Sequence, residues 1–169
     1  VAEFGPPALA LSRTGLGDEL EDARAAGARV ALFVVGGAGG ERWPDAELLS
    51  FERLPLPAVA ALSGEVTGHA LDLALSCDVR VAGADVNLRF RTIANRRMMQ
   101  LLGISRTVDV LERGGRVEAE AALSCGLVSR VGNAGEGLAL GRRVAAAIAS
   151  RGPLATQLAR AAIWRGLGP

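Results

Sequence analysis

The segment Pro57–Ala82 reads PAVAALSGEVTGHALDLALSCDVRVA, and the rest of the chain is organised around it. Its first part, Pro57–Leu62, is an apolar run that begins with a proline and follows another at Pro55, and this pattern predicts a buried strand. Two glycines, Gly64 and Gly68, come next and stand four residues apart. Paired glycines in so short a stretch predict a turn at the end of the strand.

A short buried helix is predicted from His69, because the apolar residues at 71 and 73–75 recur at helical spacing. After it, Asp78 is followed by Val79 and Val81, which predict a further strand. A strand, a turn and a helix in this order leave free backbone N–H groups where the helix begins. Such a helix start attracts an anion or a developing oxyanion.

The remainder of the chain alternates between predicted strands and helices. The further strands are expected over 8–11, 30–35, 86–90 and 127–131, and the further helices over 16–26, 45–54, 104–111, 118–124, 138–149 and 153–164. The alternation in the first half predicts an α/β fold with a mainly parallel sheet. The 169 residues suit one domain, with an α/β core over 1–134 and a helical segment over 135–169.

Charge and composition argue against several classes of function. A net charge of +1 predicts neither a nucleic acid nor an acidic partner. No apolar run approaches the ~20 residues that a membrane-spanning helix needs, and no signal peptide is expected. Cys77 and Cys125 lack metal-ligand spacing and are expected to be reduced thiols in a cytoplasmic protein. We therefore expect no metal site, no membrane and no nucleic acid.

The same segment resembles the crotonase (enoyl-CoA hydratase/isomerase) superfamily, whose members read roughly P-x-I-A-A-V-N-G-x-A-x-G-G-G-x-E-L-A-L-A-C-D-x-R-I-A here. The matching positions are Pro57, Ala60, Ala61, Gly64, Gly68, Leu73, Ala74, Leu75, Cys77, Asp78, Arg80 and Ala82. A weaker likeness extends over about 29–165. The resemblance implies a crotonase-like (ClpP/crotonase) fold, in which helices flank the sheet and the helical C-terminal segment packs between subunits.

In this family, two backbone N–H groups form an oxyanion hole around the carbonyl of a coenzyme A thioester. By position in the motifs, these groups would belong to His69 and Asp45. The substrate-binding residues are expected to be Gly37, Gly39, Gly68 and Thr92. The thioester would be the substrate, and no other cofactor is implied. The other interpretation of the loop at 36–45 is an ordinary glycine turn followed by a helix cap.

The two glutamates that hydratases of this family use are both changed. Asp72 stands at the first position and is one methylene shorter, while Thr92 stands at the second and cannot exchange a proton as a carboxylate does. His69, the one histidine of the chain, is a further candidate base. Asp72 could instead be a partner of Arg80 or of a backbone amide, and His69 a polar cap or packing residue.

An arginine cluster follows, formed by Arg89, Arg91, Arg96 and Arg97. Guanidinium groups pair well with phosphates, so the cluster could bind the phosphates of coenzyme A. It could equally be a solvated face or a subunit contact.

The resemblance implies a protein of acyl-CoA metabolism from the enoyl-CoA hydratase/isomerase family, with degenerate catalytic residues. Whether it is an enzyme stays open; if it is, it would use a single acid/base. The alternative is a non-catalytic accessory subunit that stabilises a partner enzyme. A homotrimer, a hexamer or a hetero-oligomer with a related enzyme is expected. A Ser-His-Asp peptidase on the related fold is disfavoured, because His69 stands where that chemistry needs a serine.

Overall fold

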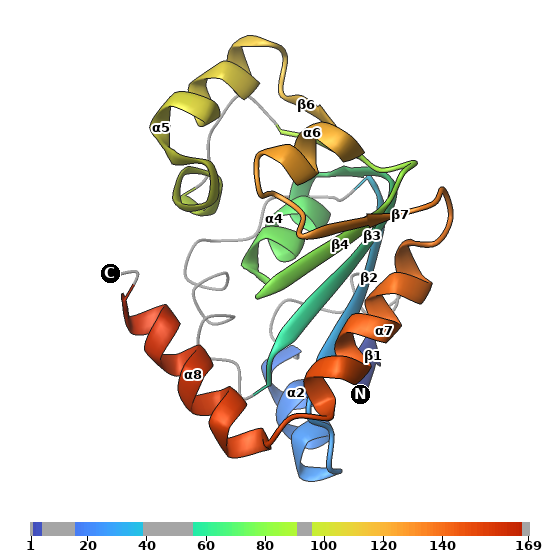
Figure 1. Cartoon of the computed structure of the whole chain (residues 1–169), viewed down its shortest axis with the longest axis vertical. Coiled ribbons are helices and arrows are strands. Elements are labelled where there is room, and N and C mark those ends of the chain that lie inside the picture. The colour runs from blue at the N-terminus through green and yellow to red at the C-terminus, as the bar shows by residue number, and fades with distance from the viewer. Residues whose placement is uncertain (1, 5–15, 39–55, 91–95, 167–169) are drawn as a thin grey trace.

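The computed structural model describes residues 2–4, 16–38, 56–90 and 96–166 (Figure 1). Its helices are α2 (Leu16–Ala25), α4 (Gly68–Ser76), α5 (Arg96–Glu112), α6 (Ala119–Ser124), α7 (Gly137–Ala149) and α8 (Pro153–Gly166). Its strands are β1 (Ala2–Phe4), β2 (Ala31–Ala38), β3 (Ala58–Thr67), β4 (Val79–Gly83), β5 (Asn87–Arg89), β6 (Arg116–Glu118) and β7 (Arg130–Gly132).

Five strands form a parallel sheet in the order β1-β2-β3-β4-β7. Towards its C-terminal end β3 also pairs in parallel with β5, and β5 pairs antiparallel with β6. The predicted α/β class with a mainly parallel sheet and a helical C-terminal part is therefore confirmed.

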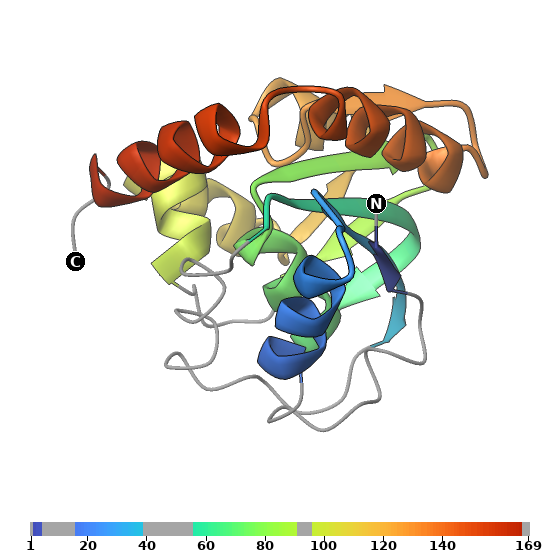
Figure 2. The ribbon, with the colours of Figure 1, turned by 90° about the horizontal axis from the view of Figure 1, so that it is seen from below.

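Strand β3 is buried on both faces over its first half, which explains its unbroken apolar sequence. Ala60 and Leu62 belong to the core beneath α4, together with Phe33 of β2. Val59 and Ala61 belong to the core beneath α7. Figure 2 shows this layering, with α7 on one face of the sheet and α2 and α4 on the other.

The predicted turn after Leu62 is wrong in form, because β3 continues as a strand to Thr67. The two glycines nevertheless act where the sequence placed them. Gly64 has φ of +61° beside a bulge, where the pairing with β2 shifts register between Val35 and Gly37. Across this bulge β3 exchanges β4 for β5 as its neighbour. Gly68, also at φ of +61°, makes the sharp change from strand to helix.

Other boundaries differ from prediction for identifiable reasons. The helix predicted over 104–111 begins at Arg96, and Gly103, at φ of +72°, breaks its regular geometry. The strand predicted over 127–131 lies at Arg130–Gly132; the residues before it, Leu127 and Val128, are apolar because they are buried in the preceding loop. Strand β6 was not predicted. The elements predicted over 8–11 and 45–54 lie outside the described residues.

Candidate functional site

The start of α4 lies at the carboxyl ends of β2 and β3, where parallel sheets commonly hold their ligands. The residue before it, Thr67, has extended backbone and makes no side-chain cap to α4 within the described structure. Its hydroxyl instead donates a hydrogen bond to the backbone oxygen of Arg89 at 3.1 Å. The first turn of α4 contains no acidic residue either. The first N–H groups of this helix are thus left for another acceptor.

His69 is the second residue of α4 and is half-buried. Its Nδ1 atom is buried and has no hydrogen-bond partner among the residues that the structure describes. A buried polar atom without a partner costs roughly 1–3 kcal/mol and asks for an explanation. A ligand seated at the helix start would supply one.

Asp72 is three residues after His69 and therefore lies one turn further along the same side of α4. Its side chain is buried, with 8% exposure. A carboxylate so buried is unusual, and such groups are often functional. The arginine named in the sequence as a possible partner, Arg80, donates to the backbone oxygens of Leu127 at 2.6 Å and Cys77 at 2.7 Å.

The structure brings together only part of the predicted site. Gly37, at φ of +88° near the end of β2, is paired with Val66 of β3, and Gly68 comes directly after the last residue of β3. These glycines therefore share one edge of the sheet with His69. Asp45, Gly39 and Thr92 lie outside the described residues, so the second half of the predicted oxyanion hole stays a prediction.

The predicted arginine cluster is divided. Arg89 lies on β5 and makes an exposed ion pair with Glu65 at 3.8 Å. Arg97 lies on α5, where it donates to the backbone oxygen of Leu75 at 3.1 Å and stands 3.9 Å over the ring of Trp164. Arg91 lies outside the described residues, as does the side chain of Arg96.

Sequence reasoning missed a second polar site, at the opposite end of the strands. The carboxylate of Asp78 accepts hydrogen bonds from the backbone N–H of Ala58 at 2.7 Å, from Arg160 at 2.8 and 2.9 Å, and from the Trp164 indole at 2.8 Å. These contacts fasten α8 to the sheet. A signal was present in the sequence: Arg160 and Trp164 are four residues apart and lie on one face of their helix.

The more buried of the two cysteines, Cys77, is a poor candidate for chemistry. Burial raises the pKa of Cys77, so this thiol stays protonated and is a poor nucleophile. Both cysteines are free. No group of three or more histidine, cysteine or acidic residues in the described ranges could hold a metal ion. Of the helices that the structure describes, none combines the length and apolar character needed to cross a membrane.

Comparison with known proteins gives a consistent set of relatives. The chain is 34% identical over 125 residues to the enoyl-CoA hydratase/isomerase family protein YngF of Bacillus subtilis, covering 69% of the chain and 48% of YngF. It is 28% identical over 129 residues to a short-chain-enoyl-CoA hydratase of Clostridium acetobutylicum, and the match covers 69% of the chain and 49% of the hydratase. The chain spans about half the length of these relatives. No family model matches it.

Solved structures agree with the sequence relatives. A monofunctional enoyl-CoA isomerase from M. smegmatis superposes with a TM-score of 0.75 at 26% identity, covering 93% of this chain and 80% of the isomerase. An enoyl-CoA hydratase from Bacillus anthracis superposes with a TM-score of 0.73 at 27% identity, covering 92% of this chain and 74% of the hydratase. Sequence and fold thus point to the same group of proteins.

Proposed function

Because this chain belongs to the crotonase (enoyl-CoA hydratase/isomerase) superfamily, we propose that it binds an acyl-CoA thioester at the start of α4 and moves a proton with one acid/base. The observation that carries the proposal is the start of α4, where within the described ranges no side chain caps the helix and the buried Nδ1 of His69 has no hydrogen-bond partner. A thioester oxygen that gains negative charge would meet the backbone N–H of His69 there. A positioned N–H donor is worth ~2.7–4 kcal/mol in a well-measured oxyanion hole.

Asp72 is the group proposed to move the proton. In a double-bond isomerisation its carboxylate would take a proton from the carbon next to the thioester carbonyl, and the electron pair would move to the carbonyl oxygen. The same carboxyl group would then return the proton two carbons further along the chain. One base is enough for this reaction. Hydration needs water to be activated as well, and Thr92 stands where the family places the second carboxylate.

The test compares two reactions on the purified protein. We expect measurable isomerisation of a 3-enoyl-CoA and negligible hydration of crotonyl-CoA. Asp72→Asn should lower the isomerisation rate by about 10²–10⁴-fold, the usual contribution of one general acid/base. Asp109→Asn is the matched control, because Asp109 is an exposed aspartate of α5 that pairs with Arg113. Unchanged turnover in Asp72→Asn would overturn the proposed role of this carboxylate.

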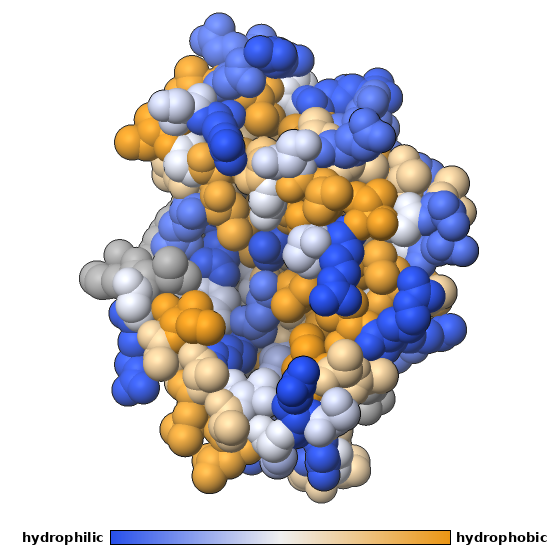
Figure 3. All heavy atoms as spheres, viewed as in Figure 1, coloured by the Kyte–Doolittle hydropathy of each residue, from blue (hydrophilic) through white to orange (hydrophobic). Residues whose placement is uncertain are grey.

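A second candidate function is a non-catalytic accessory subunit. It is favoured by the exposed apolar side chains of α8, where Leu154 is 67%, Leu158 59% and Ile163 66% exposed. Figure 3 shows hydrophobic residues gathered over this helix at the lower left. An apolar helix surface of this kind suits contact with another protein. If the chain is an accessory subunit, Asp72→Asn leaves its partner's activity unchanged, while Leu154→Asp and Leu158→Asp prevent assembly.

A further inference from the structure

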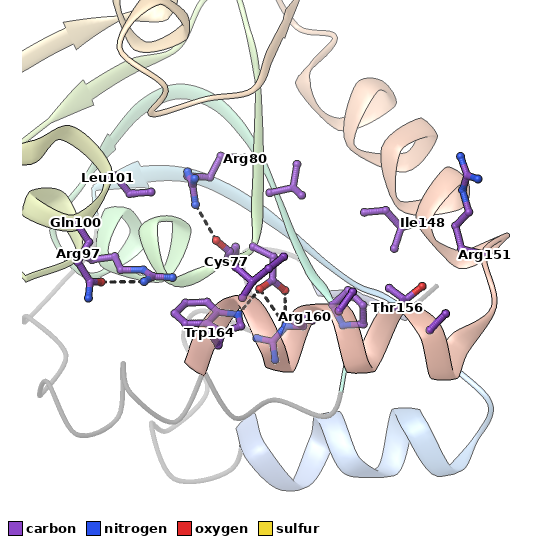
Figure 4. Close-up of a pocket in the computed structure, with 16 residues that line it drawn as sticks. Cys77, Arg80, Arg97, Gln100, Leu101, Ile148, Arg151, Thr156, Arg160 and Trp164 are labelled. Carbon is purple, nitrogen blue, oxygen red and sulfur yellow. Dashed lines mark hydrogen bonds and ion pairs between the residues drawn. The ribbon is translucent and has the colours of Figure 1, made fainter. Parts of the chain in front are cut away.

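A cavity of about 650 Å³ lies beneath α8, between this helix, the first half of α5 and the beginnings of β3 and β4 (Figure 4). It is separate from the site at the start of α4. The helix α4 runs from that site at Gly68 to the cavity at Cys77, and a helix rises ~1.5 Å per residue, which places them roughly 13 Å apart along its axis. The cavity is within the ~300–1,000 Å³ range of small-molecule sites.

The cavity exists because α8 is attached mainly at its two ends. At one end, Arg160 and Trp164 bind Asp78. At the other, a short link joins α8 to α7, with the backbone N–H of Arg151 donating to Ile148 at 3.0 Å. Between these points no side chain of α8 is buried in the described structure. The helix therefore bridges a hollow that the protein leaves open.

The walls of the hollow are mainly apolar. Leu101 comes from α5, Ile148 from α7, and Ala155, Ala159 and Ile163 from one side of α8. Their spacing on α8, four residues apart each time, lines the cavity along the length of the helix. An apolar surface of this form suits an extended hydrocarbon chain.

The charged groups around the walls are mostly positive. The lining residues include four arginines, at positions 80, 97, 151 and 160, and one carboxylate, that of Asp78, for a formal sum of +3. Arg160 neutralises Asp78. The Arg151 side chain, by contrast, makes no hydrogen bond or ion pair to any residue that the structure describes, and it is exposed. In Figure 4 it lies with Ile148 at the end of the cavity away from Trp164.

We propose that this cavity binds an alkyl carboxylate of the size of a medium-chain fatty acid. The carboxylate pairs with Arg151 at the end of the cavity away from Trp164. The hydrocarbon chain follows Ile148 and the alanines of α8 towards Ile163. A single anionic head on an apolar chain matches both the excess positive charge and the apolar walls.

Calorimetric titration of the full chain with decanoate tests the proposal, with 1-decanol as an uncharged probe of the same length. Ala159→Phe, which puts a large side chain into the hollow, should weaken decanoate binding by about tenfold or more. Arg151→Ala should weaken decanoate by about two- to fivefold, as expected for one exposed ion pair, and leave decanol unchanged. Arg143→Ala is the matched control, because Arg143 is exposed on α7 and does not line the cavity. It should change neither titration.

Three results would overturn the proposal: no binding of decanoate below its solubility limit, equal binding by the wild type and a folded Ala159→Phe variant, or equal effects of Arg151→Ala and Arg143→Ala. If circular dichroism shows that Ala159→Phe does not fold, Ala155→Leu replaces it in the test. This change also narrows the cavity from the α8 side, but with a side chain smaller than phenylalanine. Sedimentation at the concentrations of the titration adds a further criterion. If binding disappears as copies associate, another copy occupies the cavity and the proposal is wrong.

Discussion

At the scale of single residues, the structure distinguishes buried polar groups that have hydrogen-bond partners from those that have none among the described residues. Asp78 and Arg80 are satisfied within the protein, and each holds two or more segments together. The Nδ1 of His69 is the contrary case, because it is buried and has no hydrogen-bond partner in the described part of the chain. Such a defect lowers stability, and it is expected where a protein keeps a group for a ligand. This contrast is why the start of α4 is the candidate site.

Asp85 gives a prediction at this scale. Its carboxylate accepts hydrogen bonds from the backbone N–H groups of Gly135 at 2.8 Å and Gly64 at 2.9 Å, and so joins the bulge of β3 to the loop before α7. These hydrogen bonds, that from Gly135 most of all, hold the pKa of Asp85 below its usual value. A lowered folded-state pKa means that the stabilisation is present above the unfolded pKa of ~3.9 and is lost as the pH falls through the folded pKa.

We therefore expect Asp85→Asn to lower the free energy of unfolding near pH 7. The difference from the wild type should begin to shrink as the pH falls below about 4 and should be lost once the pH is below the lowered folded-state pKa, where both proteins carry an uncharged side chain. Urea unfolding at a series of pH values measures it. A difference that is constant from pH 7 to pH 3 would contradict this assignment.

At the scale of elements, the sequence was most informative where periodicity and glycines agree. Strand β3 and helix α4 were predicted because a doubly buried strand must be apolar throughout and a short buried helix repeats its apolar residues. The bulge at Gly64 was predicted as a turn, because a glycine pair signals positive φ without saying whether pairing continues beyond it. Of the predicted site residues, His69 and Asp72 lie together on α4, and their roles stay predictions. The hydrogen bonds of Arg160 and Trp164 to Asp78, here called the latch, join residues 82 and 86 positions apart. The spacing of Arg160 and Trp164 indicates that the two act together, but no local pattern identifies Asp78 as their partner.

The contact of α7 with the sheet gives a prediction for elements. Gly137 and Gly141 are one turn apart and face β3. A Cβ at Gly141 would lie 2.6 Å from the Cβ of Ala61 and 3.1 Å from Cδ1 of Leu32. Gly141→Ala should therefore separate α7 from the sheet and lower the free energy of unfolding by ~1–3 kcal/mol, although alanine favours a helix.

Gly152→Ala is the matched control for this change. Nothing lies within 4 Å of a Cβ at Gly152, and its φ is not positive. It should leave the free energy of unfolding within about 0.5 kcal/mol of the wild type, as exposed substitutions usually do. Chemical denaturation measures the free energy of unfolding of both variants. Equal values would show that α7 can shift away from the sheet without loss of stability.

At the scale of the whole molecule, the two ends of the parallel strands carry different features. The carboxyl ends of β2 and β3 carry the start of α4, where the thioester is proposed to bind. The opposite ends of β3 and β4 carry Asp78 and, through it, α8 with the cavity beneath. Helix α4 connects the two ends, since it begins at Gly68 and is capped at Cys77, next to Asp78. Figure 1 shows α8 reaching out from the sheet towards the side of α5, so its position depends on the latch rather than on a buried face.

The last prediction follows from this dependence. The Arg160 and Asp78 side chains are 10% and 18% exposed, so water screens their ion pair poorly. Asp78→Asn should lower the free energy of unfolding by about 3 kcal/mol, because it removes the carboxylate charge that pairs with a largely buried guanidinium. It should also release α8, which hydrogen exchange of the 153–166 amides would detect as faster exchange confined to this helix. In a Trp43→Phe background the remaining tryptophan, Trp164, should fluoresce at longer wavelength as its ring becomes solvated.

Glu3→Gln is the control, because it removes another ion pair to an arginine of the C-terminal helices. Glu3 and Arg142 lie 2.8 Å apart but are 37% and 59% exposed, so their pair should contribute only ~0–1 kcal/mol. If the two variants lost equal stability, burial would not be what gives the Asp78 latch its strength. If Asp78→Asn left the exchange of α8 unchanged, the helix would be held by its packing against α5 and the sheet. The cavity beneath it would then persist without the latch.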